Sequence, residues 1–182
     1  MGSLKVLALC GSLRQESLNR KLMHQAIALA PRGVDVQEGK ICAIPLYSQD
    51  LQQMGFPESV ETLHRQLMES DAILVVTPEY NYSIPGVLKN AIDWLSRYSP
   101  HGFNNKPVAI MGASPGRMGT SRCQYHLRQV MVFLNAWVLN RPEVMVSEAH
   151  LAFDEAGNLK EHRLKELVES QMQALRQMIH GE

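Results

Sequence analysis

The sequence predicts a doubly wound α/β domain, in which helices cover both faces of a parallel sheet. Two observations predict it. Short apolar runs recur along the chain, and they are continuous rather than alternating, as expected for strands buried on both faces. Segments with helical periodicity separate these runs. Strands that alternate with helices of this length form a parallel sheet with helices on both sides.

The apolar runs give the expected strands in order. Four of them cover residues 4–9, 34–37, 72–77 and 107–111. A fifth strand is expected near residues 138–146, although Pro142 interrupts it. The sheet should therefore have five strands.

Helices are expected between the strands. The first covers residues 18–30 with Ser17 placed to cap it, and the second covers residues 60–68. Pro85 suits the first turn of a third helix that continues to residue 95. Two more are expected at residues 120–135 and 162–179. No linker or repeat interrupts this pattern, so residues 1–182 should form a single domain.

Composition excludes several classes of function. Eighteen basic residues balance eighteen acidic ones, which argues against nucleic acid or an anionic membrane as a partner. The three cysteines are far apart, as is usual in a reducing cytosol. The start reads as a first strand instead of a signal peptide, and the apolar stretch at 130–139 is too short to span a membrane. We therefore expect a cytoplasmic protein without a membrane span.

Three loops should lie at the edge of the sheet where doubly wound proteins bind ligands: residues 11–17, 78–83 and 112–119. The first lacks the glycine and lysine of a Walker A loop and the glycines of GxGxxG. Cys10 and Arg14 are too close together for a cysteine phosphatase, and Cys10 should be a core residue. A polar loop at a helix start remains, which suits an anion held by backbone N–H groups and Arg14. Alternatively, Ser17 only caps the helix and Arg14 only faces solvent.

The second loop, TPEYNYSIPG, follows a buried strand with two tyrosines, a glutamate and an asparagine. Aromatic rings with polar rims suit a flat heterocyclic ligand. The alternative is a plain turn at Pro78 and Asn81, with Tyr80 and Tyr82 packed on their neighbours.

The third loop contains GASPG, which matches the G-x-S-x-G nucleophile elbow, and Asp154 and His162 follow in hydrolase order. Pro115 argues against a hydrolase, because it lacks the N–H that would stabilise an oxyanion. Ser114 and Arg117 better suit a third wall of the same pocket. The seven histidines show no metal-ligand spacing, so no metal site is expected, and His126 should lie on a helix surface.

Taken together, GSLRQESLN, TPEYNYSIPGVLKNAIDWLSR and the serine-glycine turn before SRCQYHLRQ resemble the NADPH-dependent FMN reductase family, particularly its bacterial quinone and chromate reductase branch. The similarity covers nearly the whole chain. The pattern GSxRxxSxN is moderately specific and PEYNYSxPGxLKNAIDW is strongly so. The resemblance implies a flavodoxin-like sheet with strand order 2-1-3-4-5, noncovalent FMN, and NADPH or NADH as electron donor.

The resemblance also implies which residues bind FMN. The first loop would hold the phosphate through Ser12, Leu13, Arg14, Ser17, Leu18 and Asn19. The other two loops would line the isoalloxazine, the second largely through its backbone, with Pro78, Glu79, Tyr80, Asn81, Tyr82, Ser114 and Gly116. No side chain is expected to act as acid, base or nucleophile. The family commonly ends the third loop with two glycines, whereas this chain has Gly119 and Thr120.

Members of the family form dimers or tetramers, and Arg122, Tyr125 and Glu143 resemble positions at their inter-dimer contact. The stretch MVFLNAWVL is apolar nearly all round, which agrees with a subunit interface, although a buried core helix and strand edge would also explain it.

The expected function is a ping-pong oxidoreductase, in which NAD(P)H delivers hydride to FMN N5 and a quinone, chromate, azo or nitro compound then takes the electrons. The alternative is a flavodoxin-type electron carrier that does not itself oxidise NAD(P)H. Such carriers are typically acidic and lack the loop arginine.

Overall fold

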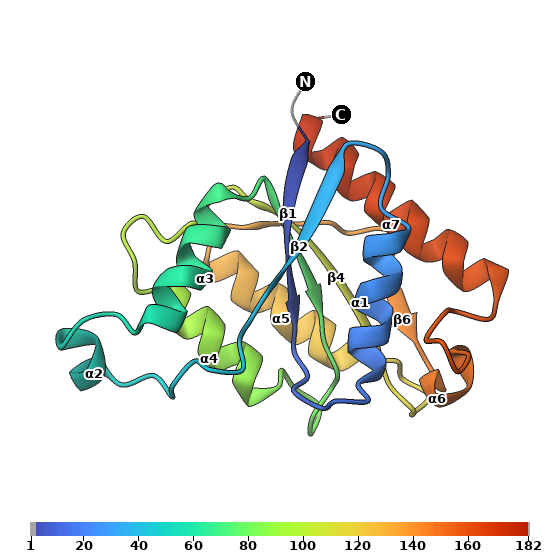
Figure 1. Cartoon of the computed structure of the whole chain (residues 1–182), viewed down its shortest axis with the longest axis horizontal. Coiled ribbons are helices and arrows are strands. Elements are labelled where there is room, and N and C mark those ends of the chain that lie inside the picture. Colours follow the sequence, from blue (N-terminus) through green and yellow to red (C-terminus); the bar gives the residue numbers. More distant parts are fainter. Residues whose placement is uncertain (1–2, 182) are drawn as a thin grey trace.

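The computed structural model describes residues 3–181 and contains a parallel sheet of six strands (Figure 1). The strands follow the order β2-β1-β3-β4-β5, and β6 also pairs with β4. Their bounds are β1 Leu4–Cys10, β2 Val34–Gly39, β3 Ala72–Val76, β4 Pro107–Ala113, β5 Trp137–Val138 and β6 Val144–Val146. The doubly wound sheet and its flavodoxin-like strand order are thereby confirmed.

The last position in the sheet differs from the single strand expected at residues 138–146. Two short strands share it: β5 pairs with the start of β4, and β6 pairs with its end. Between them the chain leaves the ladder around Pro142, and the buried side chain of Gln171 fills the gap. Its Nε2 donates hydrogen bonds to the backbone oxygens of Ile110 (3.1 Å) and Pro142 (2.7 Å). An amide side chain thus replaces ladder bonds that the interrupted strand cannot make.

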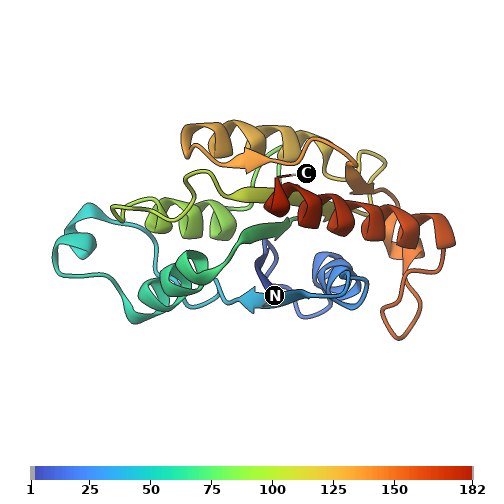
Figure 2. The ribbon, with the colours of Figure 1, turned by 90° about the horizontal axis from the view of Figure 1, so that it is seen from above.

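Helices cover both faces of the sheet. Figure 2 shows α1 and α7 on one face and α3, α4 and α5 on the other. The expected helices are all present, and two short ones, α2 and α6, were not expected because four or five residues carry no periodic pattern. The bounds are α1 Leu18–Ala28, α2 Gln49–Gln53, α3 Glu58–Glu69, α4 Gly86–Leu95, α5 Ser121–Phe133, α6 Ala149–Ala152 and α7 His162–His180. Pro85 lies just before α4, as its N-cap.

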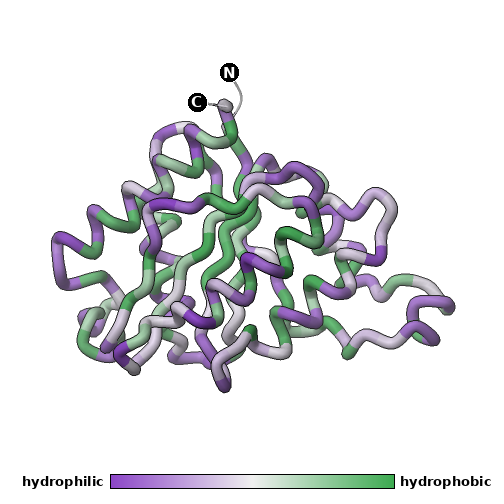
Figure 3. The backbone as a smooth tube through the Cα atoms, turned by 180° about the vertical axis from the view of Figure 1, so that it is seen from behind, coloured by the Kyte–Doolittle hydropathy of each residue, from purple (hydrophilic) through white to green (hydrophobic). Residues whose placement is uncertain are grey.

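Each face of the sheet has its own apolar core. Leu22 of α1 and Met172 of α7 belong to the core on one face, and Leu63, Leu88 and Leu127 belong to the core on the other. Figure 3 shows the apolar strands at the centre and polar residues on the outer turns of the helices. Strands β3 and β4 are buried along their whole length, which explains their continuous apolar runs.

The carboxyl ends of β1, β3 and β4 meet at one edge of the sheet, the lower edge in Figure 1. The segment 40–57, which contains α2, projects from the body at the left of that view. Asn90 Nδ2 and Trp94 Nε1 of α4 both donate to the Pro45 oxygen at 2.8 Å and hold this segment. None of the helices within residues 3–181 is long and apolar enough to cross a membrane.

Candidate functional site at the carboxyl edge of the sheet

The first loop follows β1 and leans closely on β3. Gly11 N donates to the Val76 oxygen at 2.8 Å, and a Cβ atom on Gly11 would lie 2.6 Å from Thr77 Oγ1. Only glycine fits this approach. Ser17 Oγ accepts a hydrogen bond from Arg20 N at 3.2 Å, which confirms Ser17 as the cap of α1.

Asn19 ties this loop to the end of β4. Its buried side chain donates from Nδ2 to the Ala113 oxygen and accepts at Oδ1 from Ala113 N, both at 2.8 Å. The amide oxygen and one of the two Nδ2 N–H donors of Asn19 are thereby engaged with Ala113. The structure shows that, within the chain, this side chain joins the first loop to the end of β4; its expected place at the phosphate stays a prediction.

The geometry of the first loop fits an anion. The backbone N–H groups of Leu13, Gln15 and Glu16 form no hydrogen bond within residues 3–181. They lie beside the N-terminal end of α1, where the helix dipole favours negative charge. Arg14 is exposed and makes no ion pair in the described chain, whereas the nearby Arg20 pairs with Glu38 at 3.0 Å. A phosphate would find unpaired donors and one available guanidinium here.

The second loop is a tight turn that exposes two aromatic rings. Tyr80 and Ser83 exchange two backbone hydrogen bonds, of 3.1 and 3.0 Å. The two residues between them have positive φ, 49° for Asn81 and 69° for Tyr82. Pro78 is buried, whereas Tyr80 and Tyr82 are exposed, so neither tyrosine is packed into the core. Their rings are available to a flat heterocycle.

Glu79 points away from this turn and toward α5. Its Oε1 accepts from Arg122 Nε at 2.7 Å, and its Oε2 accepts from Cys123 N at 3.0 Å. The carboxylate therefore caps α5, whose own N-cap residue, Thr120, makes no side-chain capping bond to the helix backbone. The same guanidinium lies over the ring of Tyr82, with Cζ 3.6 Å from the ring centroid.

The third loop packs on the last strand. Ser114 N donates to the Val146 oxygen at 3.0 Å, and Ser114 Oγ accepts from Gly116 N at 3.1 Å. Asp154 instead accepts hydrogen bonds from Asn158, which lower its pKa. No hydrogen bond within residues 3–181 joins Ser114 to Asp154 or His162, in agreement with the case against a hydrolase.

Thr120 ends the third loop in a left-handed conformation, with φ of 78°. Glycine adopts this conformation without strain, which explains why two glycines are common at this place in the family it resembles. Here the Thr120 hydroxyl is buried and accepts from Gln124 Nε2 at 3.0 Å. The preceding Gly119 also has positive φ, and a Cβ on it would meet the Met145 oxygen at 2.8 Å.

The cysteines near the loops are not nucleophiles. Burial raises the pKa of the Cys10 thiol, and it raises the pKa of Cys123 to about 11. Both therefore stay protonated near neutral pH, and Cys10 is a core residue as expected. In the described part of the chain, no cluster of three His, Cys, Asp or Glu side chains could hold a metal ion.

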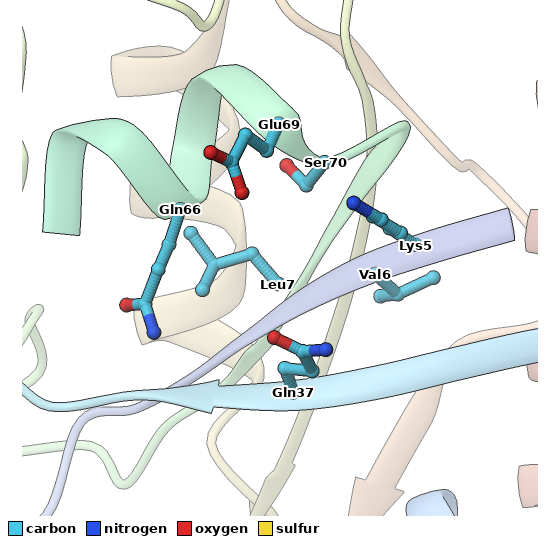
Figure 4. Close-up of a pocket in the computed structure, with 7 residues that line it drawn as sticks. All are labelled: Lys5, Val6, Leu7, Gln37, Gln66, Glu69 and Ser70. Atoms are coloured by element: carbon cyan, nitrogen blue, oxygen red, sulfur yellow. The ribbon is translucent and has the colours of Figure 1, made fainter. Parts of the chain in front are cut away.

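A small cavity of about 110 Å³ lies elsewhere, between the first half of β1 and the C-terminal end of α3 (Figure 4). Lys5, Gln37, Gln66 and Glu69 point toward it. Because the three loops follow the opposite ends of the strands, this cavity is not part of their cluster.

Two features of the site escaped sequence reasoning. The clamp from Asn19 to Ala113 spans 94 positions, and the pair of Glu79 and Arg122 spans 43. A local sequence pattern cannot indicate contacts between residues so far apart in the chain.

Comparison with known proteins places this chain in a family. Residues 4–151 match the family described as NADPH-dependent FMN reductase. The chain is 51% identical over 172 residues to an NAD(P)H-dependent FMN reductase of Pseudomonas aeruginosa, covering 94% of this chain and 93% of that protein. It is 50% identical over 144 residues to a quinone reductase of Escherichia coli K12, covering 78% and 77%.

Solved structures agree. The flavoenzyme FerB, an NAD(P)H:acceptor oxidoreductase from Paracoccus denitrificans, superposes with a TM-score of 0.90 at 33% identity and covers 98% of both chains. The apo form of the NADH:FMN oxidoreductase EmoB, at 18% identity and a TM-score of 0.73, shares the fold. The chain is therefore an enzyme of the NADPH-dependent FMN reductase family, with FMN and a nicotinamide nucleotide as its cofactors.

Proposed function

We propose that this protein is an FMN-dependent NAD(P)H oxidoreductase that reduces quinones by a ping-pong mechanism, with chromate, azo and nitro compounds as further small acceptors. One observation carries the proposal: an anion cradle and two exposed tyrosines meet at the same edge of the sheet. Several curated relatives are named quinone reductases, which supports quinones as the first acceptors to test.

The first loop would hold the FMN phosphate, through its unpaired N–H groups, Arg14 and the α1 dipole. The ring would lie along the second and third loops. The residues proposed to contact FMN are Ser12, Leu13, Arg14, Ser17, Leu18, Asn19, Pro78, Glu79, Tyr80, Asn81, Tyr82, Ser114 and Gly116. Glu79 would contribute through its backbone, since both of its carboxylate oxygens are engaged within the chain, whereas Asn19 keeps one amide N–H beyond its contact with Ala113.

FMN, when bound, supplies the redox chemistry by accepting hydride from NAD(P)H and donating electrons to the acceptor. The protein residues bind and orient, and none is proposed as acid, base or nucleophile. Exposed residues border the loops, so a nicotinamide and then an acceptor can approach in turn through the same opening. Successive approach of donor and acceptor to the same flavin agrees with a ping-pong mechanism.

A dimer or tetramer is part of the proposal. Phe133 at the end of α5 is 84% exposed, and Val132 and Trp137 beside it are exposed as well. Within the chain, the Tyr125 hydroxyl donates a hydrogen bond to Glu143 Oε1 at 3.0 Å, and Arg122 Nε donates to Glu79 Oε1 at 2.7 Å. We propose that these three polar residues also contribute to an inter-dimer contact. Free cysteines support a cytoplasmic location, and the two cores on one sheet support a single FMN-binding domain over residues 1–182.

The visible spectrum of the FMN-loaded protein distinguishes the reductase from the electron-carrier alternative. The purified protein, loaded with FMN, is mixed with NADPH or NADH in the absence of oxygen while its visible spectrum is recorded. Rapid bleaching of the yellow colour is expected for the reductase, whereas a carrier would stay yellow. Subsequent addition of a quinone should restore the colour. A colourless protein that cannot be loaded with FMN would contradict both functions.

The phosphate assignment is tested by Arg14→Ala. Removing one charge-assisted contact should weaken FMN binding about ten- to a hundredfold, measured by fluorescence titration. Arg32→Ala is the control, because this exposed arginine lies before β2, at the opposite edge of the sheet. Undiminished affinity in Arg14→Ala would mean that the phosphate lies elsewhere.

A further inference from the structure

The second loop holds a tyrosine in a backbone conformation that bulky residues rarely adopt. Both central residues of the turn have positive φ, 49° at Asn81 and 69° at Tyr82. Asparagine suits the first of these places, and glycine is the usual residue at the second. A strained backbone conformation persists only where the surrounding structure holds it, and such residues gather at functional sites.

Helix α5 provides what holds this tyrosine. The guanidinium carbon of Arg122 lies 3.6 Å from the centroid of the Tyr82 ring, and its Nε donates to Glu79 at 2.7 Å. Glu79 is fixed in turn by Cys123 N at the start of α5. On the far side of the turn, Ser83 Oγ shares a hydrogen bond of 2.8 Å with His126 Nδ1.

The contact between Arg122 and Glu79 is partly buried. An exposed ion pair contributes little, but the side chain of Glu79 is only 9% exposed, so its carboxylate depends on its partners. The planar guanidinium bonds that carboxylate with its edge and stacks on the ring with its face. Tyr82 itself is 69% exposed, so few other contacts restrain its ring.

We propose that Arg122 is a positioning residue of the flavin site: fixed by Glu79, it holds the Tyr82 ring so that the turn at residues 80–83 forms a rigid wall for FMN. This inference rests on the proposed function, since the wall is assigned to the flavin ring. Arg122 does not touch FMN in this scheme and acts through Tyr82. Lysine would keep the charge without the planar surface, so it should not replace arginine here.

The first test uses the protein without FMN. In Arg122→Gln and Arg122→Lys, the Tyr80 and Ser83 amides should exchange hydrogen roughly tenfold faster, because the turn opens more often. Arg97→Gln is the matched control: its guanidinium carbon lies 5.4 Å from the centroid of the Tyr47 ring, in the projecting segment. Unchanged exchange at residues 80–83, or equally faster exchange throughout the sheet, would overturn the proposal.

The second test is a double-mutant cycle on FMN affinity with Tyr82→Leu. Arg122→Gln should raise the FMN dissociation constant about five- to tenfold in the natural background and less than about twofold in Tyr82→Leu, since Arg122 then has nothing to position. An equal effect in both backgrounds would contradict action through Tyr82. Both tests measure FMN binding or hydrogen exchange, so they can be interpreted even if the protein does not oxidise NAD(P)H. Failure to oxidise NAD(P)H would contradict the proposed function but not this inference.

Discussion

Individual residues in this protein allow the loops to approach neighbouring strands and loops closely. Gly11 lets the first loop touch Thr77, and the amide of Asn19 binds both backbone groups of Ala113. The sequence indicated that the first loop is polar and that Ser17 caps a helix, because both are local signals. It could not indicate that Asn19 faces β4, because that depends on the sheet order.

Replacing Asn19 by alanine should destabilise the protein by about 3 kcal/mol, because two buried backbone groups of Ala113 lose their partners. Urea unfolding of the apoprotein measures this. Gln173→Ala removes an exposed amide from α7 and should change the unfolding free energy by less than about 0.5 kcal/mol. If both variants are equally stable, the hydrogen bonds between Asn19 and Ala113 do not contribute to the free energy of unfolding.

Thr120 allows a test of strain at a single position. Thr120→Gly and Thr120→Ala both remove the hydroxyl that Gln124 binds, so that loss cancels in their comparison. Glycine adopts the left-handed backbone, with φ of 78°, without the strain that a Cβ atom brings. The alanine variant should therefore be less stable than the glycine variant by about 1 kcal/mol in urea unfolding. Equal stabilities would mean that the loop shifts to relieve the strain.

Among the elements, the last strand of the sheet is the one that the local sequence pattern predicted least well. Continuous apolar runs identified β1, β3 and β4 because burial on both faces leaves a clear signal. Residues 138–146 lacked that signal. Pro142 indicated that the strand is interrupted, but it did not indicate which residue fills the gap. The partner that fills it, Gln171, comes from α7, and its spacing in that helix gives no sign of this role.

We expect Gln171→Met to destabilise the protein by about 2 kcal/mol, since methionine fills the space but leaves the oxygens of Ile110 and Pro142 without a donor. Thermal unfolding compared with Gln173→Met, on the exposed side of the same helix, gives the measurement. Faster hydrogen exchange near β5 and β6 should accompany the loss. A variant as stable as the control would show that water replaces the amide.

At the scale of the molecule, strand and helix alternation was enough to predict the fold, because a doubly wound sheet follows from few rules. The same rules predicted that the loops after β1, β3 and β4 gather at one edge. The orientation of side chains within those loops was beyond prediction: Glu79 turns to α5, and Arg122 stacks on Tyr82. Such contacts join elements that only the folded chain brings together.

Assembly is the property of the whole molecule that a surface substitution tests best. Phe133→Glu places a charge on the exposed end of α5 and should shift the protein toward smaller species in sedimentation velocity, because a charge is costly in an apolar interface. The melting temperature of the individual subunit should hardly change, because Phe133 makes little contact within its own chain. Met54→Glu is the matched variant, 79% exposed in the projecting segment. If Met54→Glu dissociates the protein and Phe133→Glu does not, the subunits meet through that segment and not through α5.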